Sequence, residues 1–132
     1  MNNECYTCHV CDEIASSIHH IIKRSKVPAL IKCPHNQVKL CAAHHYSLHH
    51  GSGQELEERL RREFLNYLQI SFLKDYIEYK DIKEVLNISD KPLRGILKIV
   101  KQKNGEYERR SLIFELMGGY LLNSEEIWRG VC

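Results

Sequence analysis

The chain has 132 residues, enough for one domain or two very small ones, and 43% of them are hydrophobic, so a packed core can form. The formal charge of +2 is too small to imply a nucleic-acid partner by itself, and no apolar run approaches the ~20 residues that span a bilayer, so we expect no membrane association. Because no N-terminal stretch resembles a signal peptide, we expect a cytoplasmic protein. Thiols stay reduced there, so six cysteines at short spacings favour metal binding over disulfides.

Residues 1–53 form a module rich in cysteine and histidine. It contains all eight histidines and every cysteine except Cys132. A polar segment this short usually needs a staple such as a structural metal. We expect two short strands at 16–22 and 38–40, joined by a basic loop, and then a helix at 42–50.

Two pairs of residues in this module have the spacing of metal ligands. A C-x-x-C pair on a tight turn presents two thiolates to one cation, and a second pair three residues apart at a helix start shares one face. Together they predict a closed tetrahedral zinc site, which would supply folding energy that the module otherwise lacks. Its four ligands are Cys8, Cys11, Cys41 and His44. Cys5 and Cys33 are the alternatives for one of these positions.

A second group of histidines predicts an open metal site. His45 and His49 are four residues apart, so they share a helix face and need a third ligand from elsewhere. Adjacent residues of a strand point to opposite faces, so if His19 turns toward the ion, His20 stays nearby and unbound. The ion would neutralise a phosphate oxygen and stabilise the leaving oxygen. His20 would take a proton from the attacking water, an effect worth about 10²–10⁴ in rate.

Three stretches of this module resemble the HNH family of nucleases, whose fold is the ββα-metal finger: HHIIKRS, PHNQVKLC and CAAHHYSLH. The resemblance implies that His19 binds the catalytic metal and that the adjacent His20 is the general base. It also implies that Asn36 holds the loop and so orients His20. His45 and His49 would then complete a three-histidine metal site.

The resemblance also concerns the metals and the phosphate contacts. A zinc knuckle is a feature of the family, although His44 stands here where a cysteine is usual, and the loop KVPALIKCPH lacks the usual glycines. The resemblance implies Mg²⁺ or Mn²⁺ as the catalytic ion, and a three-histidine site also accepts Zn²⁺ or Ni²⁺. Arg24, just past the first strand, is a candidate phosphate contact. The alternative interpretation is that it is an ordinary solvated arginine. Because such proteins are found in phages and other mobile elements, we expect the cytoplasm of a bacterial or phage-infected host cell.

The composition changes after residue 53, where we place the start of a second region, 54–132. Apolar residues recur there at three- and four-residue steps while charged residues fill the other face, which predicts an amphipathic helix. The run Gly51-Ser52-Gly53 before it is a natural hinge. More helix is expected through 75–86. The apolar positions of the first helix are Leu56, Leu60, Phe64, Leu65, Leu68 and Phe72.

The stretch IKEVLNISDKPLRGILKIV resembles a helix-turn-helix, which we place at about 75–103. Asn87 lies where the tight turn needs a left-handed residue. Ser89 or Asp90 can cap the second helix, and Pro92 lies in its first turn, where no amide donor is lost. Basic residues recur on the outer face of this helix, as expected of a recognition helix in a major groove. These candidate DNA contacts are Lys91, Arg94, Lys98 and Lys101.

A turn at Lys103-Asn104-Gly105 follows the helix-turn-helix. It is either the tip of a wing or a break before a last helix at 111–122. The apolar spacing of that last segment favours the helix.

These patterns together predict an α+β protein, with a small ββα-metal finger and zinc knuckle followed by a mostly helical region that contains the helix-turn-helix. We expect a metal-dependent endonuclease that nicks or cuts double-stranded DNA. The rival hypothesis is a non-catalytic, zinc-stabilised transcription regulator, which does not need His20. A third is a nuclease of structured or single-stranded nucleic acid. Cutting both strands needs two active sites, so a homodimer is a further alternative.

Overall fold

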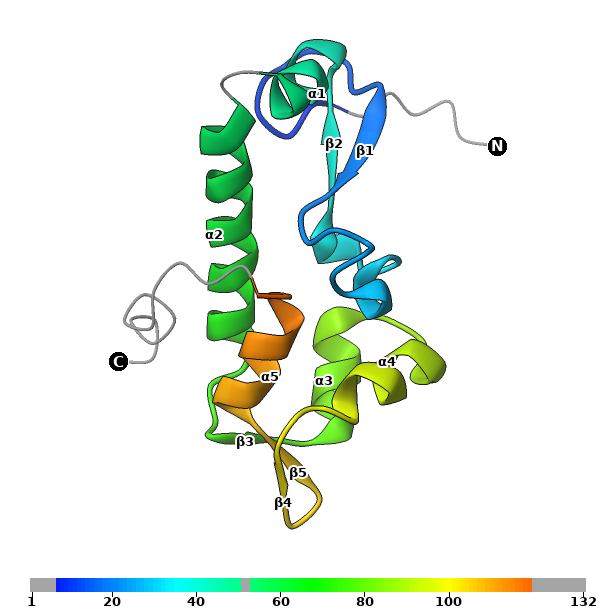
Figure 1. Cartoon of the computed structure of the whole chain (residues 1–132), viewed down its shortest axis with the longest axis vertical. Coiled ribbons are helices and arrows are strands. Elements are labelled where there is room, and N and C mark those ends of the chain that lie inside the picture. Colours follow the sequence, from blue (N-terminus) through cyan, green and yellow to red (C-terminus); the bar gives the residue numbers. More distant parts are fainter. Residues whose placement is uncertain (1–6, 51–52, 120–132) are drawn as a thin grey trace.

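The computed structural model describes residues 7–50 and 53–119, and the statements below concern these residues. The structure combines helices with two small antiparallel sheets, so the predicted α+β class is confirmed. Figure 1 shows a small ββα unit at one end, a helical region at the other, and the long helix α2 running beside both. None of the helices in the described part of the chain has the length and apolar character needed to cross a bilayer.

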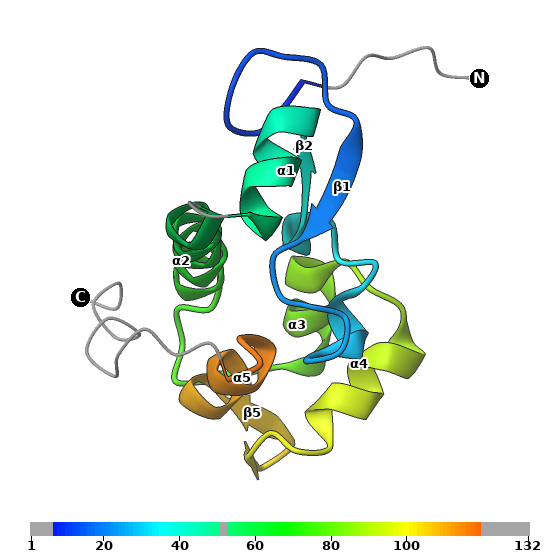
Figure 2. The ribbon, with the colours of Figure 1, turned by 45° about the horizontal axis from the view of Figure 1, so that its top comes forward.

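The ββα unit consists of β1 (Ser17–His20), β2 (Gln37–Leu40) and α1 (Ala42–His49), close to the predicted elements. The first strand is shorter than predicted, because Ile21 and Ile22 turn away from β2. Their backbone amides bond instead to the backbone and side chain of Asn36, and their side chains are buried. Helix α1 lies between the hairpin and the start of α2 (Figure 2).

The register of the hairpin places the two adjacent histidines at the end where the chain connects β1 to β2. His19 lies opposite Val38 and His20 opposite Gln37, the last pair of the ladder. The chain then makes a long connection that contains the 3₁₀ turn η1 (Pro28–Leu30) before it returns to β2. The histidine pair therefore borders this connection.

Helix α2 (Gly53–Ser71) starts in close contact with α1. A Cβ atom on Gly53 would lie 2.0 Å from the carbonyl oxygen of Ser47, so a residue with a side chain cannot occupy this position without a shift. Gly53 is thus a buried part of the helix rather than of a hinge, while residues 51–52 lie outside the described residues. The predicted apolar face is buried at Leu60, Phe64, Leu65, Leu68 and Phe72, and Leu56 is partly buried.

The segment in which we predict a helix-turn-helix contains two helices, α3 (Tyr79–Leu86) and α4 (Asp90–Leu97). Asn87 has the predicted left-handed backbone, with φ 52° and ψ 51°. The prediction of helix from residue 75 onward is wrong, because the short strand β3 (Tyr76–Ile77) precedes α3. Its pairing with a strand that follows α4 in the chain overrides any local helical preference.

That partner belongs to a hairpin made of β4 (Gln102–Lys103) and β5 (Glu106–Glu108), in a sheet of order β3-β5-β4. Asn104 and Gly105 form its turn with positive φ angles of 53° and 81°. The preference for a last helix over a wing was therefore incomplete, since the hairpin and the helix are both present. Helix α5 (Arg109–Leu116) starts earlier than predicted and is followed by a turn, and residues 120–122 lie outside the described residues.

One continuous apolar core connects the two predicted regions. The turn η1 packs against α4, and its Leu30 is fully buried, as is Leu93 on α4. Near the end of α5, a Cβ on Gly118 would lie 2.8 Å from a methyl group of Val27 and 3.2 Å from one of Ile22. The connection beside the histidine pair is thus packed against the helical region.

Candidate functional site

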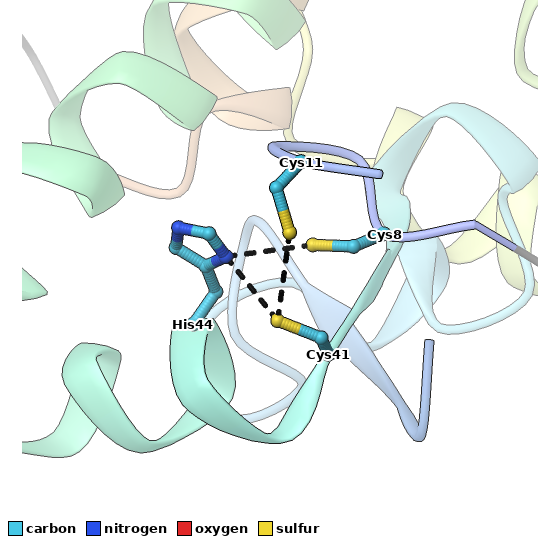
Figure 3. Close-up of side chains that lie close together, drawn as sticks. All are labelled: Cys8, Cys11, Cys41 and His44. Carbon is cyan, nitrogen blue, oxygen red and sulfur yellow. Dashed lines mark hydrogen bonds between the residues drawn. The ribbon is translucent and has the colours of Figure 1, made fainter. Parts of the chain in front are cut away.

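Four side chains meet in a compact cluster at the tip of the ββα unit (Figure 3). Cys11 Sγ lies 3.8 Å from Cys41 Sγ, and His44 Nδ1 lies 3.6 Å from Cys8 Sγ and 3.3 Å from Cys41 Sγ. Ligands of one tetrahedral zinc ion, at about 2.3 Å for sulfur and about 2.0–2.1 Å for nitrogen, would be separated by about 3.8 Å (S to S) and about 3.6 Å (S to N). The observed separations match these edges, so the Cys3His cluster could hold a metal ion such as zinc.

The cluster is assembled by two local structures. The turn that carries Cys8 and Cys11 is held by the bridge between Thr7 and Ile14 and by the 2.8 Å bond from the Cys8 amide to the Glu13 carbonyl. Cys41 is the N-cap of α1, and His44 lies in the first turn of that helix. The four residues are those predicted from their spacing. Cys33 is buried and does not belong to the cluster, and Cys5 lies outside the described residues.

The backbone around the first cysteine favours its thiolate form. Burial raises the pKa of Cys8, but hydrogen bonds from the backbone of Cys41, Val10 and Cys11 outweigh it and bring the pKa to about 6. A backbone hydrogen bond at Glu13 lowers the pKa of Cys11, whereas burial and the neighbouring cysteines raise it further than that, so its pKa lies above the ordinary value. A metal cation removes this conflict, because it binds thiolates and neutralises their charge.

A separate group of histidines surrounds an open hollow of about 470 Å³ beside the end of β1. Histidines from β1 and α1 meet there with two cationic side chains of the following loop. His45 is not among the lining residues, but its ring lies 5.1 Å from that of His49, edge to face. The lining residues are Ile18, His19, His20, Lys23, Arg24, Ser25 and His49.

The three predicted ligands of the catalytic ion are neighbours, but they do not form a closed group. Within residues 7–50 and 53–119, the Cys3His cluster is the group whose ligand atoms all lie within 4.8 Å of one another. His19 Nε2 instead bonds to a carboxylate oxygen of Glu57 at 3.0 Å. Burial lowers the pKa of His19; the Glu57 carboxylate opposes this effect, and the nearby His45 and His49 add to it. A neutral imidazole is the form that binds metals.

His20, the predicted general base, has one ring nitrogen occupied and one available. Its Nε2–H donates to the carbonyl oxygen of Ile31 at 3.0 Å, and this oxygen also accepts a bond from the Gln37 amide at 2.8 Å. A neutral imidazole that donates through Nε2 carries its lone pair on Nδ1. The arrangement can therefore accept a proton at Nδ1 while the ring is held in place.

Asn36 is fully buried and ties together the connection that supplies this carbonyl. Its Oδ1 accepts a 2.7 Å bond from the amide of Ile22, and its Nδ2 donates to the carbonyls of Ile22 (3.1 Å) and Leu30 (3.2 Å). Both ends of the loop are thereby fixed next to Ile31. Orientation of His20 through this loop is the predicted role of Asn36, and it stays a prediction.

The candidate DNA contacts are exposed. Lys91, Arg94 and Lys98 of α4 and Lys101 after it are accessible, while Leu93 and Leu97 on the same helix are buried. The Arg94 guanidinium lies 5.7 Å above the ring of Tyr79. On β4, the ammonium of Lys103 lies 5.8 Å from the ring of Tyr76. All of these cationic side chains are exposed to solvent.

The sequence did not single out Lys23, which lines the hollow, or Glu57, which bonds to His19. Lys23 directly precedes Arg24, so the basic pair itself was the available signal. Glu57 lies among several acidic residues on α2, and its spacing gives no sign that this turn of the helix faces β1. His50 at the end of the same unit is exposed and stacks on Tyr46, with ring centroids 3.9 Å apart.

The fold and the cluster define a small α+β protein with a candidate Cys3His metal centre. Comparisons with models of protein families, with curated proteins and with solved structures found no match.

Proposed function

We propose that this protein is a metal-dependent endonuclease that hydrolyses phosphodiester bonds of double-stranded DNA. The observation that carries the proposal is the state of His20, which is anchored through Nε2 and leaves Nδ1 to accept a proton. It lines the same hollow as two other histidines and the cations Lys23 and Arg24. A purely structural finger needs neither an oriented, half-exposed imidazole nor adjacent phosphate-binding charges.

In the proposed reaction, Lys23 and Arg24 hold the phosphate in the hollow by charge and hydrogen bonding. Nδ1 of His20 accepts a proton as the water oxygen bonds to phosphorus and the bond to the 3′ oxygen breaks. The 3′ oxygen takes a proton from solvent, so the products carry a 5′-phosphate and a 3′-hydroxyl. A Mg²⁺ or Mn²⁺ ion bound by His19, His45 and His49 would stabilise charge on the phosphate and on the leaving oxygen.

The remaining parts have supporting roles in this proposal. Zinc in the Cys3His cluster would fasten the tip of the ββα unit, and the exposed cations of α4 would bind the DNA backbone and groove. The core shared by η1 and α4 supports a fixed distance between these cations and the hollow. We therefore expect cleavage at a constant offset from the bound site rather than over a broad window.

The rival proposal is a zinc-stabilised DNA-binding regulator that does not cut. The exposed cations of the predicted helix-turn-helix support the regulator as well as they support the nuclease, because DNA binding by these residues does not require an active site nearby. His20 separates the two proposals. A regulator would bind DNA as well after His20→Ala as before it, and it would nick DNA with neither sequence.

The test is nicking of supercoiled plasmid in the presence of Mg²⁺ or Mn²⁺. We expect His20→Ala to lower the rate by about 10²–10⁴ while DNA binding and the circular dichroism spectrum stay unchanged. His50→Ala is the matched control, since His50 is an exposed histidine of the same unit that does not line the hollow. No nicking by the unmodified protein in any divalent metal, with DNA binding intact, would favour the regulator. Single-stranded and structured substrates in the same assay test the third hypothesis.

A further inference from the structure

Glu57 of α2 hydrogen-bonds to a histidine that lines the hollow. Its Oε1 accepts the 3.0 Å bond from His19 Nε2, and the two side chains are only 20% and 12% exposed. Its Oε2 lies 3.5 Å from Nη2 of Arg61, one helical turn further on. The carboxylate is thus held between a cation on its own helix and an imidazole on β1.

This contact determines which nitrogen of His19 remains for a metal ion. A neutral imidazole that donates through Nε2 has its lone pair on Nδ1. Histidines that bind metals commonly donate their other N–H to a carboxylate, which fixes the tautomer and the orientation of the ring. The Arg61 charge next to the second oxygen keeps the carboxylate directed along the helix.

We propose that Glu57 is a positioning residue for the metal site of the hollow, which it serves by holding His19 with Nδ1 as the ligand atom. This inference rests on the proposed function, because it assumes that His19, His45 and His49 bind an ion. It adds a residue that is outside the ββα unit and assigns a function to the contact between β1 and α2.

The same helix carries a matched control. Glu63 bonds to His9 Nε2 at 2.7 Å, so the chemistry of the pair is the same. Both partners are 41% exposed, however, and neither lines the hollow. Exposed ion pairs of this kind contribute little to stability. Glu63→Gln therefore removes the same charge from α2 as Glu57→Gln does, but at a position that does not contact the residues of the hollow.

The experiment measures binding of Mn²⁺, and separately of Ni²⁺, to the zinc-loaded protein by isothermal titration calorimetry. We expect Glu57→Gln to weaken this second site by about 10–100-fold and Glu63→Gln to leave it unchanged. Nitrogen NMR of the metal-free hollow should show His19 protonated on Nε2 in the unmodified protein and in Glu63→Gln, and a mixture of tautomers in Glu57→Gln. A merely structural contact would change the melting temperature but not the tautomer.

A second comparison links the effect to His19. In a His19→Ala background, Glu57→Gln should have no further effect on the affinity for the second ion. Equal affinity and equal tautomer populations in Glu57→Gln and Glu63→Gln would overturn the inference while leaving the proposed nuclease intact. Failure of the unmodified protein to bind any second ion would overturn the three-histidine site itself, and the role of Glu57 with it.

Discussion

Helix α1 contributes histidines to both groups of metal-capable side chains, yet the two groups differ in how they are built. The Cys3His cluster is closed: its sulfur and nitrogen atoms all lie within 4.8 Å of one another, with separations close to those of a tetrahedral zinc site. The histidines of the hollow lie near one another without converging, and His19 is engaged by a carboxylate. Structural zinc sites use four protein ligands, whereas catalytic sites keep a position open. The comparison shows that a high density of cysteine and histidine on a short segment does not by itself tell which of these residues form a closed metal site. That depends on whether the ligand atoms converge in the folded protein.

The largest effect is expected from a substitution that removes a ligand of the closed cluster. We expect Cys11→Ser to abolish cooperative folding of the ββα unit, because structural zinc supplies about 10–16 kcal/mol at neutral pH to small modules of this type. Thermal melts followed by circular dichroism, with and without chelator, measure this effect. Cys33→Ala is the control, since Cys33 is buried but lies outside the cluster, and it should retain bound zinc. A melt unchanged by chelator would mean that the cluster does not stabilise the fold.

The next largest effect is expected at Asn36, whose buried side chain holds the loop beside the hollow. Asn36→Ala removes three buried hydrogen bonds to Ile22 and Leu30, and we expect a loss of roughly 3 kcal/mol in the free energy of unfolding. Urea titration measures it. Because zinc binds elsewhere, the zinc content of the folded variant should stay normal. A change below about 1 kcal/mol would show that water replaces the amide at this position.

A smaller effect on stability distinguishes the ligands of the hollow from those of the cluster. We expect His49→Ala to change the free energy of unfolding by no more than about 0.5 kcal/mol, since His49 is exposed. Its nicking rate should fall by at least about tenfold, the lower range for groups that support a metal ligand. A strong loss of stability would place His49 in the folding core of the unit and would weaken the contrast between the two groups.

The smallest effect lies outside both groups and serves as a reference. The hydroxyl of Tyr79 (2.6 Å) and the ammonium of Lys83 (2.9 Å) hold the pKa of Asp90 below its ordinary value of 3.8. A lowered pKa stabilises the fold above pH 3.8, and this contribution disappears as the pH falls through the lower, folded-state value. The melting temperatures of Asp90→Asn and the unmodified protein should therefore differ slightly at pH 6 and converge as the pH falls through the lowered pKa of Asp90.

Local spacing predicted the two ligand pairs of the closed cluster and several elements. Cys8 with Cys11 and Cys41 with His44 are each three residues apart, so a turn and a helix start place the two members of each pair close together. That the two pairs meet depends on the pairing of β1 with β2. Asn87 was predictable because few residues tolerate its left-handed backbone. The buried face of α2 followed from helical periodicity in the same way.

The strand β3 and the contact of Glu57 with His19 were not predictable from local spacing. Tyr76 and Ile77 pair with residues 107 and 108, about thirty positions away. Two residues are too few to show the alternation of apolar and polar side chains that predicts a strand. Glu57 resembles any acidic residue on the polar face of a helix. Its partner depends on how α2 leaves α1, where Gly53 permits an approach that a side chain would block.

The sequence by itself determined the two local ligand pairs of the Cys3His cluster, the succession of two strands and a helix, and the turn between α3 and α4, because each depends on residues a few positions apart. Only the tertiary structure decided that the loop after β1 packs against α4 and that α2 delivers a carboxylate to His19. Such contacts depend on the relative placement of whole elements, which is set by burial of the shared apolar core and not by any one stretch of the chain.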